Sequence, residues 1–148
     1  GERTPHNDAA IRGAFTGLGT DTRREDLTRA VLEGVAFGLR DSFEALKATG
    51  ARLESLIAIG GGTGSRYWLK LIATVLGVPL KLPAGGEFGA ALGAARLGIC
   101  AATGADPRAV MTLPDLGTAI AADASQGSAY DDAFARFRAA YPAIRATQ

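Results

Sequence analysis

The sequence of this 148-residue chain holds one cysteine, Cys100, and one histidine, His6. An internal disulfide therefore cannot form, and a metal site built from several cysteines or histidines is excluded. A Ser-His-Asp triad would have to depend on His6. A lone cysteine is typical of a reducing compartment, and we expect the protein to be cytoplasmic.

Long apolar runs and blocks of like charge are also missing. No stretch reaches the length of a membrane-spanning helix, and no signal peptide is visible at the start. The formal net charge is +1, with both signs mixed along the chain, so nucleic-acid binding is not indicated. The length predicts one domain over residues 1–148. The chain begins at Gly1 without methionine, and we expect a fragment of a longer protein.

Glycine, in contrast, is abundant at 20 residues, and the most informative cluster lies mid-chain. Residues 56–59 form a continuous apolar run, which is typical of a strand buried on both faces. A glycine-rich turn follows at 60–64, and Ser65 can cap a helix. Apolar residues at helical spacing then continue to Gly77, which predicts a helix that stops there. The unit is strand, glycine turn, helix.

This turn is the most ligand-ready place in the sequence. Glycines let a flat ligand or a phosphate approach the backbone, and a helix N-terminus offers free N–H donors. The P-loop pattern fails because no Gly-Lys pair follows, and the dinucleotide fingerprint fails because its last glycine would fall on Ser65 or Tyr67. The residues alone leave two interpretations open: a turn that holds a nucleotide, and a tight turn without a ligand.

The flanking elements follow from local signals. Thr22 and Glu25 form a capping-box pattern, which predicts a long helix over 23–48. Residues 78–83 predict a second strand, and two strands joined by a helix imply a parallel βαβ unit. Residues 84–101 predict a helix rich in alanine and glycine that sits close to the sheet, with Glu87 near its first turn.

The C-terminal part is predicted to be mostly helical. Asp106-Pro107 predicts a short helix, and residues 112–124 are ambiguous, with a short extended part. A last helix is expected from about residue 126, where an aromatic stripe at helical spacing indicates core packing. The stripe consists of Tyr130, Phe134, Phe137 and Tyr141.

The carboxylates offer no obvious general base. Asp8 lies in a polar loop over residues 1–12, Asp21 lies at a cap, and Asp26 lies at a helix start. Each has an adequate structural explanation, so we expect no catalytic residue in this chain.

Several stretches together resemble the FGGY family of carbohydrate kinases. Residues 13–33, GAFTGLGTDTRREDLTRAVLE, agree with the constrained positions of the family's second signature. The opening GERTPHND, the turn IGGGTGSRYW and the later PAGGEFGAALGAARLG resemble three further family segments. The resemblance extends from residue 1 to about residue 100.

The resemblance implies an α/β fold, namely part of an actin/hexokinase-like (ribonuclease H-like) ATPase domain with a small parallel βαβ sheet and flanking helices. It implies the C-terminal part of the second kinase domain, using ATP and Mg²⁺ in the full-length enzyme. The sugar site and the general base would lie in a domain outside this chain, which alone should be inactive. The implied ATP-binding residues are Gly60, Gly61, Gly62, Thr63 and Ser65, and no metal ligand is expected here.

The expected acceptor is D-xylulose, with glycerol, ribulose or gluconate as alternatives within the family. An alternative from another class is a noncatalytic nucleotide-binding or oligomerisation module. A Rossmann oxidoreductase is disfavoured by the failed fingerprint. Because a strand edge without a partner invites pairing with another chain, we also expect self-association.

Overall fold

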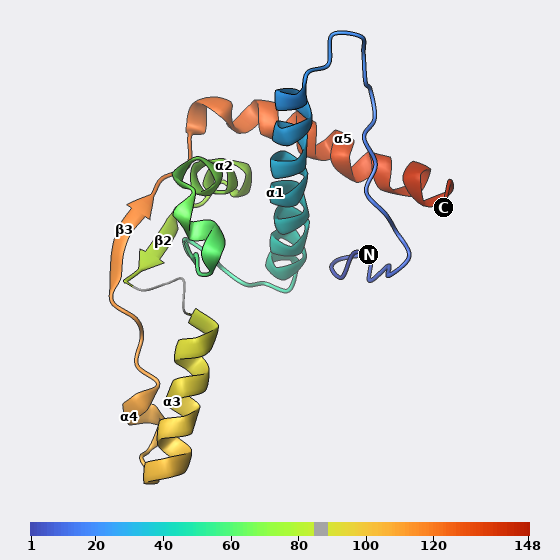
Figure 1. Cartoon of the computed structure of the whole chain (residues 1–148). Coiled ribbons are helices and arrows are strands. Elements are labelled where there is room, and N and C mark those ends of the chain that lie inside the picture. The colour runs from blue at the N-terminus through green and yellow to red at the C-terminus, as the bar shows by residue number, and fades with distance from the viewer. Residues whose placement is uncertain (85–88) are drawn as a thin grey trace.

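The structure is a computed structural model that describes residues 1–84 and 89–148. Figure 1 shows the order of the elements and their arrangement around a small sheet. In chain order they are α1 (Arg24–Ala48), β1 (Leu56–Ile57), the 3₁₀ turn η1 (Gly61–Gly64), α2 (Arg66–Leu76), β2 (Leu80–Pro83), α3 (Gly89–Thr103), α4 (Pro107–Val110), β3 (Leu116–Ile120), the 3₁₀ turn η3 (Ala124–Gln126) and α5 (Gly127–Arg145).

The sheet has three strands in the order β1-β2-β3. β1 and β2 are parallel, with Leu56 opposite Leu80, which confirms the predicted βαβ unit. β3 pairs antiparallel with β2, with Ile120 opposite Leu80. β3 is the extended part expected within residues 112–124, and β1 is left as an edge strand.

Helix α2 lies between the sheet and the other long helices, and both of its sides are buried. Leu69 and Ala73 pack against the sheet residues Leu80 and Ile120. The opposite side packs on α1 and α5 in a second cluster, whose buried members are Ala36, Phe37, Leu71, Val75, Tyr130 and Phe134. This placement fixes the start of α2, and with it the glycine turn that precedes it.

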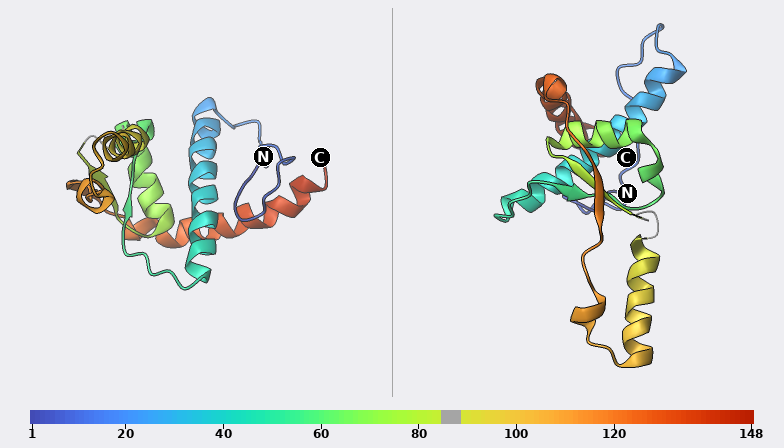
Figure 2. Two further views of the ribbon diagram at one scale, coloured as in Figure 1. Left: turned by 90° about the horizontal axis from the view of Figure 1, so that it is seen from below. Right: turned by 90° about the vertical axis from the view of Figure 1, so that its left-hand side faces the viewer.

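Helices α1 and α5 are tied by charge as well as by apolar packing. The Arg40 guanidinium lies 2.6 Å from the Asp131 carboxylate, and Arg138 lies 3.2 Å from the buried Asp41. Figure 2 shows the two helices crossing beside α2. The aromatic stripe of α5 is partly confirmed as core, because Tyr130 and Phe134 are buried whereas Phe137 is partly exposed.

Helix α1 begins one residue later than predicted, and its cap differs. The N-cap is Arg23, whose backbone N–H donates to the Asp26 carboxylate at 2.9 Å. The expected capping residue, Thr22, instead accepts a hydrogen bond from the Gly19 N–H at 2.9 Å. The predicted Thr22–Glu25 capping box is therefore wrong, because the Thr22 hydroxyl accepts a hydrogen bond within a tight turn at Gly19 and does not cap the helix.

Two expectations about the sheet faces are also wrong. α3 does not lie on the sheet: none of its described residues is buried, and it lies beyond the sheet beside α4 (Figures 1 and 2). Consequently the run at 56–59 is not buried on both faces. Ile57 and Ile59 keep 45% and 56% of their surface exposed, because α2 covers only one side of the sheet. The expected helix start at residue 84 is wrong, because this residue lies in a turn, and Glu87 lies outside the described residues.

Local signals elsewhere are confirmed. The Asp106 carboxylate caps α4 by accepting the Arg108 N–H at 2.9 Å. Gly77 ends α2 in the left-handed conformation, with φ of 69°. No described helix combines the length and hydrophobicity that crossing a bilayer requires.

Candidate functional site

The glycine turn brings the predicted nucleotide-binding residues together between β1 and α2. Gly60 has φ of 96°, a conformation that side chains rarely adopt, and it redirects the chain out of the strand. Its carbonyl oxygen accepts two hydrogen bonds from Thr63, from Oγ1 at 2.8 Å and from the backbone N–H at 3.0 Å. Thr63 thus closes the turn with its own hydroxyl, and Gly60 supplies the acceptor.

Ser65 is the N-cap of α2, as predicted. Its Oγ accepts the Trp68 backbone N–H at 3.3 Å, and its backbone has the extended conformation typical of a cap. The hydroxyl proton of Ser65 is not needed for that bond. The cap therefore leaves Ser65 with a donor beside the positive end of the helix dipole.

The free space around the turn is unevenly distributed. A Cβ atom built on Gly61 or Gly64 would meet no atom of residues 1–84 or 89–148 within 4 Å, so both face space that these residues leave open. A Cβ on Gly62 would lie 3.0 Å from Cζ3 of Trp68. A flat ligand therefore has more room at Gly61 than at Gly62, where the indole ring of Trp68 takes the space.

These features allow a ligand to approach the backbone of the turn closely. Gly61 and Gly64 expose bare backbone, and the start of α2 supplies N–H donors. Within residues 1–84 and 89–148, no group of three or more His, Cys, Asp or Glu side chains could hold a metal ion. The turn therefore offers open backbone to a ligand, and the described residues offer no cluster for a divalent cation.

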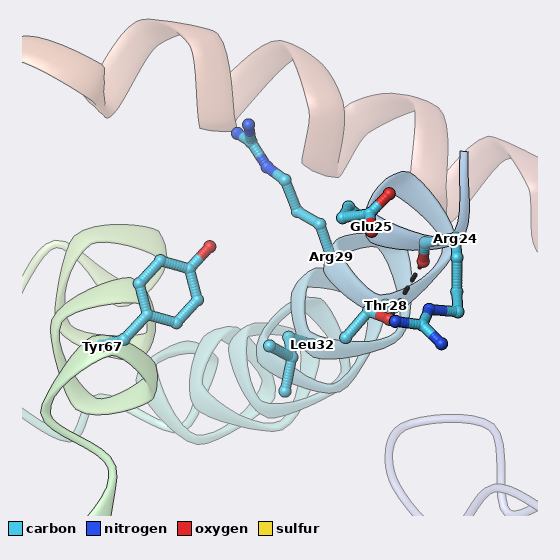
Figure 3. Close-up of a pocket in the computed structure, with 6 residues that line it drawn as sticks. All are labelled: Arg24, Glu25, Thr28, Arg29, Leu32 and Tyr67. Atoms are coloured by element: carbon cyan, nitrogen blue, oxygen red, sulfur yellow. Dashed lines mark hydrogen bonds between the residues drawn. The ribbon is translucent and has the colours of Figure 1, made fainter. Parts of the chain in front are cut away.

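Two grooves lie elsewhere, one between α1 and α2 and the other among α1, α2, η3 and α5, and sequence reasoning did not identify them. One has a volume of about 240 Å³ and the other of about 210 Å³, and both are lined by Arg29 and Tyr67. Figure 3 shows Tyr67 across the first groove from Leu32 and Arg29. None of the predicted nucleotide-binding residues lines either groove. The guanidinium of Arg29 is held by the Glu33 carboxylate at 2.7 Å, which raises its pKa.

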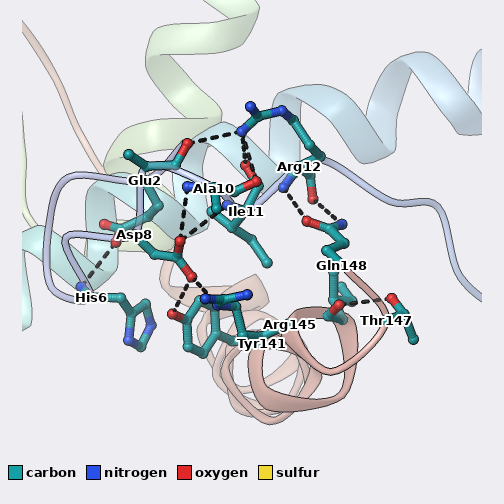
Figure 4. Close-up of polar contacts among 12 residues, drawn as sticks. Glu2, His6, Asp8, Ala10, Ile11, Arg12, Tyr141, Arg145, Thr147 and Gln148 are labelled. Carbon is teal, nitrogen blue, oxygen red and sulfur yellow. Dashed lines mark hydrogen bonds and ion pairs between the residues drawn. The ribbon is translucent and has the colours of Figure 1, made fainter.

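The polar loop at the start of the chain is tied to α5 (Figure 4). The Asp8 carboxylate accepts the Tyr141 hydroxyl at 2.9 Å and pairs with Arg145 at 2.7 Å. The His6 ring stacks on Tyr141, with ring centroids 3.7 Å apart. Burial and the Asp8 hydrogen bond raise the pKa of Tyr141. The structural explanation of Asp8 as a loop residue is therefore confirmed, with a specific partner helix.

The sequence and the fold of this chain are similar to those of known proteins. Residues 1–102 match the family described as the FGGY family of carbohydrate kinases, C-terminal domain. The xylulose kinase of Escherichia coli strain K12 is 45% identical over 102 residues, which are 69% of this chain and 21% of that protein. The glycerol kinase of Aquifex aeolicus strain VF5 is 38% identical over 92 residues, which are 62% of this chain and 18% of that protein.

A solved structure of a xyloylose (xylulose) kinase from Brucella ovis matches over the whole chain. It is 55% identical with a TM-score of 0.85, and the match covers 100% of this chain and 31% of that one. The predicted fold class, part of a ribonuclease H-like domain with a small sheet and flanking helices, is confirmed. The chain spans about a fifth of the E. coli relative and less than a third of the Brucella protein.

Proposed function

Because this chain belongs to the FGGY family of carbohydrate kinases, we propose that it forms the adenosine-binding part of an ATP-dependent sugar kinase. The proposed reaction transfers the terminal phosphoryl group of ATP to D-xylulose, giving D-xylulose 5-phosphate and ADP. The observation that carries this proposal is the family match over residues 1–102, which includes the glycine turn with its open backbone at Gly61 and Gly64.

The division of labour in this reaction follows from what phosphoryl transfer needs. It depends on positioning, on charge stabilisation, usually with Mg²⁺, and on a base that orients the attacking hydroxyl. The described residues supply a nucleoside surface, whereas Asp8 and Asp26 are both engaged in structural hydrogen bonds. We propose that residues 1–148 act as one unit, the C-terminal part of the second kinase domain. The sugar, the base and the Mg²⁺ site would then be contributed from outside this chain.

Gly60, Gly61, Gly62, Thr63 and Ser65 are the proposed ATP-binding residues. The hydrogen bonds from Thr63 to Gly60 support a rigid turn, and the cap at Ser65 supports an ordered helix start beside it. ATP supplies the phosphoryl group, and this chain's own contribution is to bind and orient the nucleoside. The nucleoside is remote from the reacting atoms, and its binding energy contributes to kcat as well as to the KM for ATP.

The acceptor is the least constrained part of the proposal. D-Xylulose is favoured because the E. coli and Brucella relatives are xylulose kinases. Glycerol is an alternative because the Aquifex relative is a glycerol kinase, and ribulose and gluconate complete the set to be tested.

The experiment is a phosphorylation assay of two polypeptides, the 148-residue chain and the product of the complete reading frame that contains it. Each is supplied with ATP, Mg²⁺ and one acceptor from the set above. We expect ATP- and xylulose-dependent release of ADP from the complete product and none from the 148-residue chain. Turnover with another acceptor alone would reject xylulose, and absence of turnover with every acceptor would reject the kinase proposal.

A second candidate is a noncatalytic nucleotide-binding or oligomerisation module. It is favoured by the edge position of β1 and by exposed apolar side chains at Ile57 and Ile59. If the reading frame encodes only these 148 residues, and ATP binding occurs without turnover, this second function replaces the first.

A further inference from the structure

Trp68 lies directly beneath the glycine turn and joins it to the core. It belongs to the first turn of α2 and packs against the buried cluster shared by α1, α2 and α5. Its benzene-ring edge faces Gly62, because a Cβ on Gly62 would meet Cζ3 at 3.0 Å and Cε3 at 3.4 Å. The backbone N–H of Trp68 also donates to Ser65 at 3.3 Å. One residue therefore contacts both the middle and the end of the turn.

We propose that Trp68 is the positioning residue of this turn: its indole seats Gly62 against the core, so that Gly61 and Gly64 face bound adenosine. This inference rests on the proposed ATP-binding function. It assigns different roles to neighbouring glycines that the sequence pattern treats alike. Gly62 is glycine because of the ring beneath it, whereas Gly61 is glycine because of the ligand above it.

The physical need for such a support comes from the composition of the turn. Three of the four residues of η1 are glycines, and glycine has the largest conformational freedom to lose on folding. A rigid flat ring below the backbone restricts that freedom, while Thr63 closes the turn from within. The turn is then ordered before a ligand arrives, which lowers the cost of binding.

The indole nitrogen indicates that the ring is held for its shape. Nε1 of Trp68 is buried and has no hydrogen-bond partner within the described part of the chain. Buried Trp N–H groups usually find a partner. The described contacts of the Trp68 ring are therefore its packing against Gly62 and the core.

The first experiment needs no nucleotide and uses the 148-residue chain, in which Trp68 is the single tryptophan. Five proteins are compared: wild type, Gly62→Ala, Trp68→Leu, the double variant of these two, and Gly61→Ala as the matched control. We expect Gly62→Ala to lower the unfolding midpoint by about 3 °C and to shift the Trp68 emission. Gly61→Ala should change neither. In the Trp68→Leu background, Gly62→Ala should cost little, because the ring it meets is gone.

The second experiment measures KM for ATP and for xylulose in the product of the complete reading frame. Gly61→Ala is expected to raise the KM for ATP several-fold without changing the unfolding midpoint or the KM for xylulose. Gly62→Ala is expected to raise the KM for ATP with Trp68 present and to have a smaller effect in the Trp68→Leu background. If Trp68 had a purely structural role, the effect of Gly62→Ala on the KM for ATP would not depend on the presence of Trp68.

The outcomes separate this inference from the proposed function. Additive effects of Gly62→Ala and Trp68→Leu, with normal ATP-dependent turnover in the wild type, would overturn the inference alone. So would an unchanged KM for ATP in a folded Gly61→Ala variant. Absence of turnover in the wild type would overturn the proposed function and the adenosine half of the inference, whereas coupling between the two sites would still support the seating of Gly62.

Discussion

Asp8 helps to join the beginning of the chain to its end, and its charge contributes to that contact. Burial acts to raise the pKa of Asp8, but hydrogen bonds from Tyr141, Ala10 and Ile11 and the charge of Arg145 hold it below its ordinary value of 3.8. Because the folded-state pKa is the lower one, the carboxylate stabilises the fold above its ordinary pKa. That contribution is lost as pH falls through the folded-state pKa.

We therefore expect Asp8→Asn to release residues 1–12 from α5, because the Arg145 pair and the charge-assisted bond from Tyr141 are both lost. Amide exchange of this segment should become several-fold faster, and wild type should show the same change only as pH falls below 3.8, through the lowered pKa of Asp8. Asp21→Asn, at an exposed carboxylate, serves as the control. Equal protection in Asp8→Asn and wild type at pH 7 would contradict the assignment.

Ser65 has two roles that a single substitution confuses, and a pair of substitutions separates them. Ser65→Ala removes the acceptor for the Trp68 N–H and should lower the free energy of unfolding by about 1 kcal/mol in denaturant titrations. Ser65→Asn keeps a capping oxygen and should restore most of that loss. If both variants raise the KM for ATP although Ser65→Asn restores stability, the hydroxyl itself contacts the nucleotide. A stable Ser65→Ala protein would argue against the cap.

At the scale of elements, local signals were sufficient where one short segment decides the outcome. Ser65 precedes α2 and Gly77 follows it, and both predicted ends of the helix are confirmed. The start of α1 is predicted wrongly because Thr22 has two possible partners, and its hydroxyl accepts the Gly19 N–H instead of capping the helix. The contact between Gly62 and the Trp68 ring could not be predicted, because it depends on how α2 packs against its neighbours.

Helix α3 shows what sequence pattern could not settle. Its small residues predict a close fit to a sheet, but the described part of α3 contacts mainly α4 and the segment after it, where Arg96 donates to the Thr112 carbonyl at 2.7 Å. Leu97 remains 63% exposed. A helical period reveals an apolar face, but it does not name the surface that covers that face.

The stability of α3 should accordingly be lower than that of the other long helices. In hydrogen exchange on the 148-residue chain, we expect α3 amides to exchange before those of α1 and α2, because α3 buries no described side chain. Leu97→Ala should change the free energy of unfolding by less than about 0.5 kcal/mol, whereas Leu71→Ala in the core should cost about 2–5 kcal/mol. Equal protection of α3 and α2 would show that α3 is buried in solution.

The whole molecule is built unevenly around α2. Two buried clusters lie on opposite sides of that helix, while the far side of the sheet is only partly covered. β1 presents an edge strand, and Ile57 and Ile59 lie exposed at and just beyond it. An edge strand flanked by apolar side chains can pair with another chain, and natural proteins often block such pairing with a lysine.

We therefore predict that the 148-residue chain self-associates through the β1 edge. Sedimentation velocity over a range of concentrations should show a reversible shift from monomer to a larger species. Burying an isoleucine side chain is worth about 1.5–3 kcal/mol, so Ile57→Lys should weaken association by about tenfold or more. Val31→Lys places the same charge on an exposed apolar residue of α1 and should leave association unchanged. A concentration-independent monomer would refute self-association, and equal weakening by both substitutions would place the contact away from β1.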